Sequence, residues 1–126
     1  MSKSFRELKV WQLAIDLSLT IYKLTAGFPK QEIYGITSQM RRASVSIASN
    51  IAEGSARGTK KDFRQFVLIA KGSICELQTQ LLIARRLKYS DLESFNIAEQ
   101  QAMDIAQMLS GLSTYLAAPS PLKLSN

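Results

Sequence analysis

One uninterrupted helical pattern, from about Lys60 to Lys88, constrains this chain more than any other feature. Its apolar positions recur every three or four residues, at Phe63, Phe66, Ala70, Ile74, Leu77, Leu81 and Ala84. A helix of that span would be ~40 Å long at ~1.5 Å per residue. Such a stripe is typical of a helix that packs one face into a core.

The start of this helix carries basic residues where the helix dipole favours acidic ones. Thr59 is suited to be the N-cap and Asp62 takes the place of the capping-box acid. Lys60, Lys61 and Arg64 follow, and each such base costs on the order of 0.3–1 kcal/mol relative to a carboxylate. Two interpretations carry equal weight here: a phosphate-binding helix start, or a solvated turn whose charges are not optimised.

The middle of the helix contains residues that are poor helix formers or costly to bury. Gly72 costs roughly 1 kcal/mol of helix propensity, and with Ser73 it is placed where a neighbouring helix of small residues could cross. Glu76 lies among apolar residues and needs a partner if it is buried. Candidate partners are Arg41, Arg42 and Asn50.

Three further helices are expected. The first runs from about Arg6 to Thr25 behind a Ser4-x-x-Glu7 capping box. It has two apolar stripes (Leu8, Trp11, Ile15 and Tyr22; Val10, Leu13, Leu17, Ile21 and Leu24). Two stripes fit either a central bundle helix or a helix that also contacts another subunit.

The second helix begins between Pro29 and Thr37 and ends near Gly54, and the fourth runs from a Ser90–Glu93 capping box to about Ala117. One face of the second helix is made of small residues, which allow close helix packing (Ala43, Ser44, Ser46, Ala48, Ser49 and Ala52). Near its end, at least one of Asn50 and Glu53 is expected to make buried hydrogen bonds.

These patterns predict an all-α protein, an antiparallel up-down-up-down four-helix bundle with short loops. No segment has a strand pattern. A chain of 126 residues suffices for one domain, which we place at residues 1–118. The segment 119–126 is expected to be a disordered tail.

The composition excludes several kinds of site. With no histidine and one cysteine, a zinc site is close to excluded, and we expect no metal, cofactor or catalytic residue. The single thiol, Cys75, is expected to be buried.

Apolar runs are too short for a membrane span and the N-terminus lacks a signal core. A cytoplasmic protein is expected.

The positive charge is concentrated in the middle of the chain. The formal net charge is +6, and the stretch from Arg41 to Lys71, with seven bases and two acids, contributes +5 of it. A basic field of this kind favours nucleic acid or another anionic surface as a partner. The simpler alternative is a surplus of charge that aids solubility.

Two long motifs resemble a known family. They are Q-M-R-R-A-S-V-S-I-A-S-N-I-A-E-G, from Gln39 to Gly54, and K-D-F-R-Q-F-V-L-I-A-K-G-S-I-C-E-L, from Lys61 to Leu77. L-K-V-W-Q-L-A, from Leu8, and F-P-K-Q-E-I-Y-G-I, from Phe28, add to the likeness. Together they resemble the bacterial four-helix-bundle family once called S23 ribosomal proteins, many of them encoded in intervening sequences of 23S ribosomal RNA genes.

The resemblance implies a ring-shaped homopentamer. It also implies similarity to the accessory variability protein of diversity-generating retroelements, a basic pentamer that works with a reverse transcriptase and RNA. The motif residues that match are structural positions in this family, not catalytic ones (Asn50, Glu53, Gly54, Gly72, Ser73 and Glu76).

The leading hypothesis is a non-catalytic, oligomeric scaffold that binds nucleic acid, above all RNA. Phosphate contacts are expected from the central bases (Arg41, Arg57, Lys60, Lys61, Arg64 and Lys71). With no aromatic residue exposed by pattern nearby, binding should follow backbone charge and RNA shape, without base contacts. The alternative is an adaptor that docks an acidic or RNA-bound partner such as a polymerase or reverse transcriptase. No small-molecule substrate or membrane partner is expected.

Overall fold

The computed structural model describes residues 4–119, which form four α-helices and no strand. These are α1 (Lys9–Thr25), α2 (Ile36–Ser55), α3 (Lys60–Arg86) and α4 (Leu92–Ala117). Short 3-10 turns, η1 (Phe5–Glu7) and η2 (Lys30–Glu32), precede α1 and connect it to α2. The prediction of an all-α four-helix bundle is confirmed. Of the predicted tail, only Pro119 lies within the described residues.

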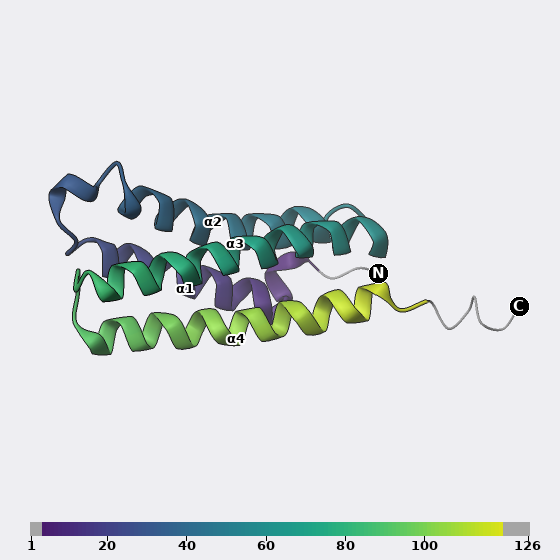
Figure 1. Ribbon diagram of the computed structural model, residues 1–126. Helices are drawn as coiled ribbons and strands as arrows, with labels where there is room; N and C mark the ends of the chain where they lie inside the picture. Colours follow the sequence, from purple (N-terminus) through teal and green to yellow (C-terminus); the bar gives the residue numbers. More distant parts are fainter. Residues whose placement is uncertain (1–3, 120–126) are drawn as a thin grey trace, which may run out of the picture.

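Each helix packs against two others, in the order α1, α2, α3, α4 and back to α1. The helices therefore stand at the corners of a square with one shared core, and the described part of the chain begins and ends at the same end of the bundle (Figure 1). The largest side chains buried there come from all four helices (Phe95, Leu17, Ile21, Met40, Ile47, Ile51, Ile74, Leu77, Leu81, Ile105, Leu109 and Val67).

The first helix begins later than its capping box predicts. Ser4 does cap, since its hydroxyl accepts a hydrogen bond from the N–H of Arg6 at 3.2 Å, but it caps the short η1 turn. Leu8 is then extended, with φ −74° and ψ 122°, so α1 starts at Lys9 without a side-chain cap. The interruption directs Phe5 onto Trp11, with ring centroids 5.1 Å apart.

The third helix begins as predicted and ends two residues early. The Thr59 hydroxyl accepts from the N–H of Asp62 at 3.1 Å. At the other end Lys88 takes a left-handed conformation, with φ 61°. The N–H of Tyr89 donates to the carbonyl of Ala84 and that of Lys88 donates to the carbonyl of Arg85. This pair of bonds is the Schellman motif, which closes a helix C-terminus.

The cap of α4 is Asp91, one residue later than the predicted box at Ser90. One oxygen of Asp91 accepts from the N–H of Ser94 at 2.7 Å and the other from the Ser94 hydroxyl at 2.9 Å. Because both bonds favour the ionised carboxylate, they lower the pKa of Asp91 below its ordinary value.

The crossing of α2 and α3 uses some of the predicted small residues and not others. A Cβ built on Gly54 would lie 2.6 Å from the Cβ of Phe66, and the hydroxyls of Ser46 and Ser73 are 3.0 Å apart. Gly72, in contrast, faces open space. The prediction that Gly72 lies at the crossing is therefore wrong, because it lies on the opposite face of α3.

The expectation that Cys75 is buried is wrong, and the condition under which Glu76 would need a buried partner is not met. Both residues are exposed, and Glu76 lines a surface hollow beside Arg42 of α2. Of the two residues expected to make buried hydrogen bonds, Asn50 makes one in a half-buried position, to the carbonyl of Ser46 in its own helix at 2.8 Å, whereas Glu53 is exposed.

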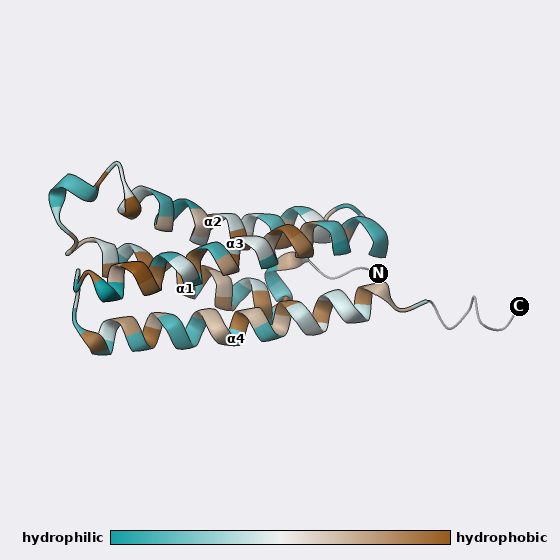
Figure 2. Ribbon diagram, viewed as in Figure 1, coloured by the Kyte–Doolittle hydropathy of each residue, from teal (hydrophilic) through white to brown (hydrophobic). Residues whose placement is uncertain are grey.

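Apolar residues occur on exposed surface as well as in the core. Figure 2 shows them as brown segments in every helix. On the outer side of α3 they form what we call the α3 outer face (Leu68, Ile69, Leu82 and Ile83, all exposed). Among the described helices α3 is long and apolar enough to cross a membrane, a criterion that core helices of soluble proteins also meet. The expectation of no membrane span stays a prediction.

Candidate nucleic-acid interface

The first turn of α3 and the end of α4 meet at one end of the bundle. There they form an open pocket of about 510 Å³. Three of the predicted phosphate-binding residues, Lys60, Lys61 and Arg64, line it together with Gln65 and residues 116–119. We call these three residues the basic cluster. The antiparallel pairing of α3 with α4 thus places the predicted basic helix start in a surface hollow.

Two members of the basic cluster are held by α4. Arg64 donates from Nε to the carbonyl oxygen of Ser113 at 3.0 Å. The ammonium of Lys60 lies 4.6 Å from the ring centroid of Tyr115, a cation–π contact. Lys61 is exposed. Anchoring through a carbonyl and a ring positions both cations without neutralising their charge.

Within residues 4–119 no carboxylate forms an ion pair with the basic cluster. The ion pairs found there are Arg57 with Glu53, at 3.1 Å, and Arg85 with Glu99, at 2.8 Å. Lys60, Lys61 and Arg64 therefore add their charges without a neutralising partner from the described chain. Such a group of cations attracts phosphates.

Arg57 is near the basic cluster in sequence but is already engaged. Besides its ion pair with Glu53, its guanidinium lies 4.9 Å from the ring centroid of Phe66. The pair is exposed, with about half of each side chain accessible, so it contributes little to stability. It does reduce the charge that Arg57 offers to a phosphate.

Arg41 and Lys71 do not line the pocket. Arg41 donates from Nε to the hydroxyl of Thr25 at 2.9 Å and stacks over the ring of Tyr22 at 4.7 Å. These contacts tie α2 to the last turn of α1, at the opposite end of the bundle. Lys71 is half-buried farther along α3. The structure thus brings together three of the six predicted binding residues.

Tyr115 is the residue that sequence reasoning missed. It lies in the last turn of α4 beside Lys60 and keeps 62% of its surface exposed. The prediction that no exposed aromatic residue accompanies the basic residues is therefore wrong. Tyr115 is 55 positions from Lys60, and only the pairing of α3 with α4 brings them together.

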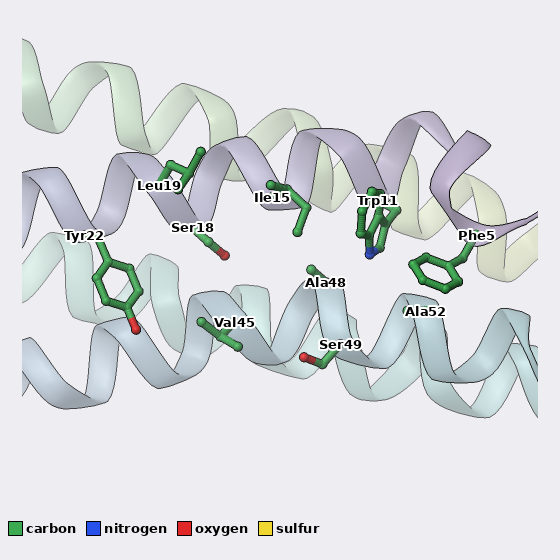
Figure 3. Close-up of a pocket in the computed structure, with 10 residues that line it drawn as sticks. All are labelled: Phe5, Trp11, Ile15, Ser18, Leu19, Tyr22, Val45, Ala48, Ser49 and Ala52. Atoms are coloured by element: carbon green, nitrogen blue, oxygen red, sulfur yellow. The ribbon is translucent and has the colours of Figure 1, made fainter.

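A second surface feature is an apolar groove between α1 and α2, with a volume of about 430 Å³. Aromatic and branched side chains line it, and α2 contributes Val45, Ala48, Ser49 and Ala52 (Figure 3). Leu19 at its edge is 65% exposed. Ser18 also lines the groove, and its buried hydroxyl oxygen has no hydrogen-bond partner.

The described residues contain no group of three or more His, Cys, Asp or Glu placed to hold a metal ion. The expectation that the protein has no metal, no cofactor and no catalytic site stays an expectation.

Comparisons with known proteins agree with the fold. The model of the family described as 23S rRNA-intervening sequence protein matches residues 6–111. A crystal structure of a protein of unknown function from the S23 ribosomal protein family of Bacteroides thetaiotaomicron is similar, with a TM-score of 0.74 and 21% identity. The match covers 82% of this chain and 97% of that one. No curated protein matches.

Proposed function

This chain belongs to the 23S rRNA-intervening sequence protein family, and we propose that it is a non-catalytic, oligomeric scaffold that binds nucleic acid, above all RNA, in the cytoplasm. The observation that carries the proposal is the basic cluster. Lys60, Lys61 and Arg64 line one open pocket, and no carboxylate of residues 4–119 pairs with them.

The geometry of the basic cluster suits phosphate groups. The N-terminal end of α3 adds the positive end of its dipole and the first-turn N–H groups that the Thr59 hydroxyl does not cap. Arg64 is fixed by Ser113, so it loses little side-chain entropy when a phosphate binds. Lys61 is exposed and can follow the backbone of a flexible ligand.

Self-association would multiply this basic cluster and raise the avidity for a long polyanion. Two separate apolar surfaces support it: the α1–α2 groove and the α3 outer face. Exposed apolar patches of this kind mark interaction sites.

We propose that a second copy of the chain covers these two surfaces. Because the two surfaces differ, one copy's outer face would enter the next copy's groove, the head-to-tail arrangement that closes rings. The pentamer implied by the resemblance fits this arrangement.

The test is the salt dependence of RNA binding, measured by fluorescence anisotropy with a labelled RNA. Each phosphate contact that is lost lowers the slope of log K against log salt concentration by about 1. Lys60→Gln/Lys61→Gln should therefore bind more weakly with a slope smaller by about 1–2. The matched control, Lys23→Gln/Lys30→Gln, removes as many charges from the opposite end and should bind like wild type. Equal affinity and slope for all three proteins would reject the proposal.

The alternative function is an adaptor whose basic cluster docks an acidic or RNA-bound protein. The same unpaired charges favour it, because acidic peptide and RNA backbone present similar charge. A partner that stays bound after nuclease treatment, and leaves when Lys60 and Lys61 are changed to Gln, would support the adaptor over direct RNA binding.

A further inference from the structure

We propose that Tyr115 is a stacking platform for an unpaired base, so that the basic end of the bundle prefers single-stranded nucleic acid to a duplex. The inference rests on the proposed function and names the class of nucleic acid that the same site takes. It also replaces the expectation that binding depends on charge and shape alone.

The first observation is the exposure of an aromatic ring at a helix end. Tyr115 keeps 62% of its surface accessible although its neighbour Leu116 is buried. Exposed tyrosines are not unusual by themselves. This one, however, contacts the ammonium of Lys60, which lines the pocket together with Lys61 and Arg64.

The second observation is the contact between the ring and a cation. The ammonium of Lys60 lies over the ring, 4.6 Å from its centroid. With most of the residue exposed, a second planar group has room on the ring. A base stacked there would have its own phosphate next to Lys60 and the rest of the basic cluster.

These two elements, an aromatic surface and adjacent cations, are the parts from which single-strand sites are built. Bases stack on aromatic side chains with little regard to sequence, while the cations follow the backbone. In a duplex the bases already stack on one another and their faces are covered, so the ring can gain nothing from them. The cations contact both forms, whereas stacking on the Tyr115 ring is available to the single strand alone.

The experiment measures affinity for a labelled 12-nucleotide single strand and for the matching duplex at one salt concentration, in RNA and DNA versions. Tyr115→Phe keeps an aromatic surface and should bind both ligands like wild type. Tyr115→Leu keeps apolar bulk without the planar ring. It should lose about 5- to 100-fold in affinity for the single strand and bind the duplex like wild type. Circular dichroism and light scattering would verify that fold and assembly are unchanged.

The outcomes separate the inference from the proposed function. If Lys60→Gln/Lys61→Gln weakens binding of both ligands while Tyr115→Leu weakens neither, the stacking inference is overturned and the proposed function stands. Equal loss for single strand and duplex in Tyr115→Leu would also overturn the inference, since it would mean that the ring only positions Lys60. If wild type binds neither ligand, both proposals fail.

Discussion

Gly54 of α2 lies so close to α3 that a Cβ built on it would be 2.6 Å from the Cβ of Phe66 and 3.0 Å from Cδ1 of Phe63. Both neighbours are half-buried, but the Phe66 atom is a Cβ, which is fixed to the α3 backbone and cannot move away cheaply. Gly54→Ala gains about 1 kcal/mol of helix propensity but forces the two helices apart. We expect a net loss of about 1–3 kcal/mol in the free energy of unfolding, measured by urea denaturation.

Gly72 provides the matched control, because it is also a glycine inside a helix but faces open space. Gly72→Ala should raise the free energy of unfolding of the monomer by about 0.5–1 kcal/mol. If both substitutions stabilise the protein, α2 does not pack closely on α3 at Gly54.

These two glycines also show what a sequence pattern can predict. Periodicity and capping residues fix the number, type and approximate bounds of the helices, because both signals are local. Which glycine faces a neighbour depends on how the helices are rotated against each other, and that is a tertiary property. Gly54, beside the end of α2, and Gly72, in mid-α3, look equally suited to close packing until the bundle is assembled.

In the candidate site, too, some residues could be predicted from the sequence and others could not. Lys60, Lys61 and Arg64 are recognisable from one helical turn that starts with bases. Tyr115 is not, because its distance from them in sequence hides its proximity in space. The engagement of Arg57 with Glu53 follows from i, i+4 spacing and could have been foreseen. The hydrogen bond from Arg41 to Thr25 of α1 could not have been foreseen, since it joins two helices.

Lys88 is strained by its position after α3. Its φ of 61° belongs to the left-handed region, which costs a residue with a Cβ roughly 1–2 kcal/mol. Lys88→Gly should therefore raise the free energy of unfolding by about 0.5–1 kcal/mol after the greater chain entropy of glycine is subtracted. Thermal and urea unfolding would measure it. Arg86→Gly, two residues earlier within the helix, should instead destabilise by about 0.5–1 kcal/mol, and a gain there would contradict the assignment of the cap.

The cap of α4 should make stability depend on acid pH. Hydrogen bonds from the N–H and hydroxyl of Ser94 hold the pKa of Asp91 below that of an unfolded aspartate. The unfolded chain therefore takes up this proton at a higher pH than the folded chain does. The stabilisation is complete above the unfolded pKa and is lost as pH falls through the lowered folded pKa. Asp91→Asn keeps a capping oxygen that does not titrate, so its melting temperature should fall less between about pH 5 and pH 2. If the melting temperatures of wild type and Asp91→Asn fell equally over this pH range, other carboxylates would account for the acid sensitivity.

The proposed head-to-tail assembly predicts a specific result when two variants are mixed. Leu19→Glu places a charge at the edge of the α1–α2 groove, and Leu82→Glu places one on the α3 outer face, both at exposed positions. Each alone should shift the wild-type oligomer to monomer in size-exclusion chromatography with light scattering, because a carboxylate would be buried without a partner. Leu92→Glu, at another exposed leucine in the first turn of α4, should leave the oligomer intact.

Mixing the two monomeric variants tests the head-to-tail contact directly. In an equimolar mixture, Leu82→Glu still has an intact groove and Leu19→Glu still has an intact outer face. The mixture should therefore form a dimer and grow no further, whereas a two-fold contact that pairs like surfaces would leave monomers only.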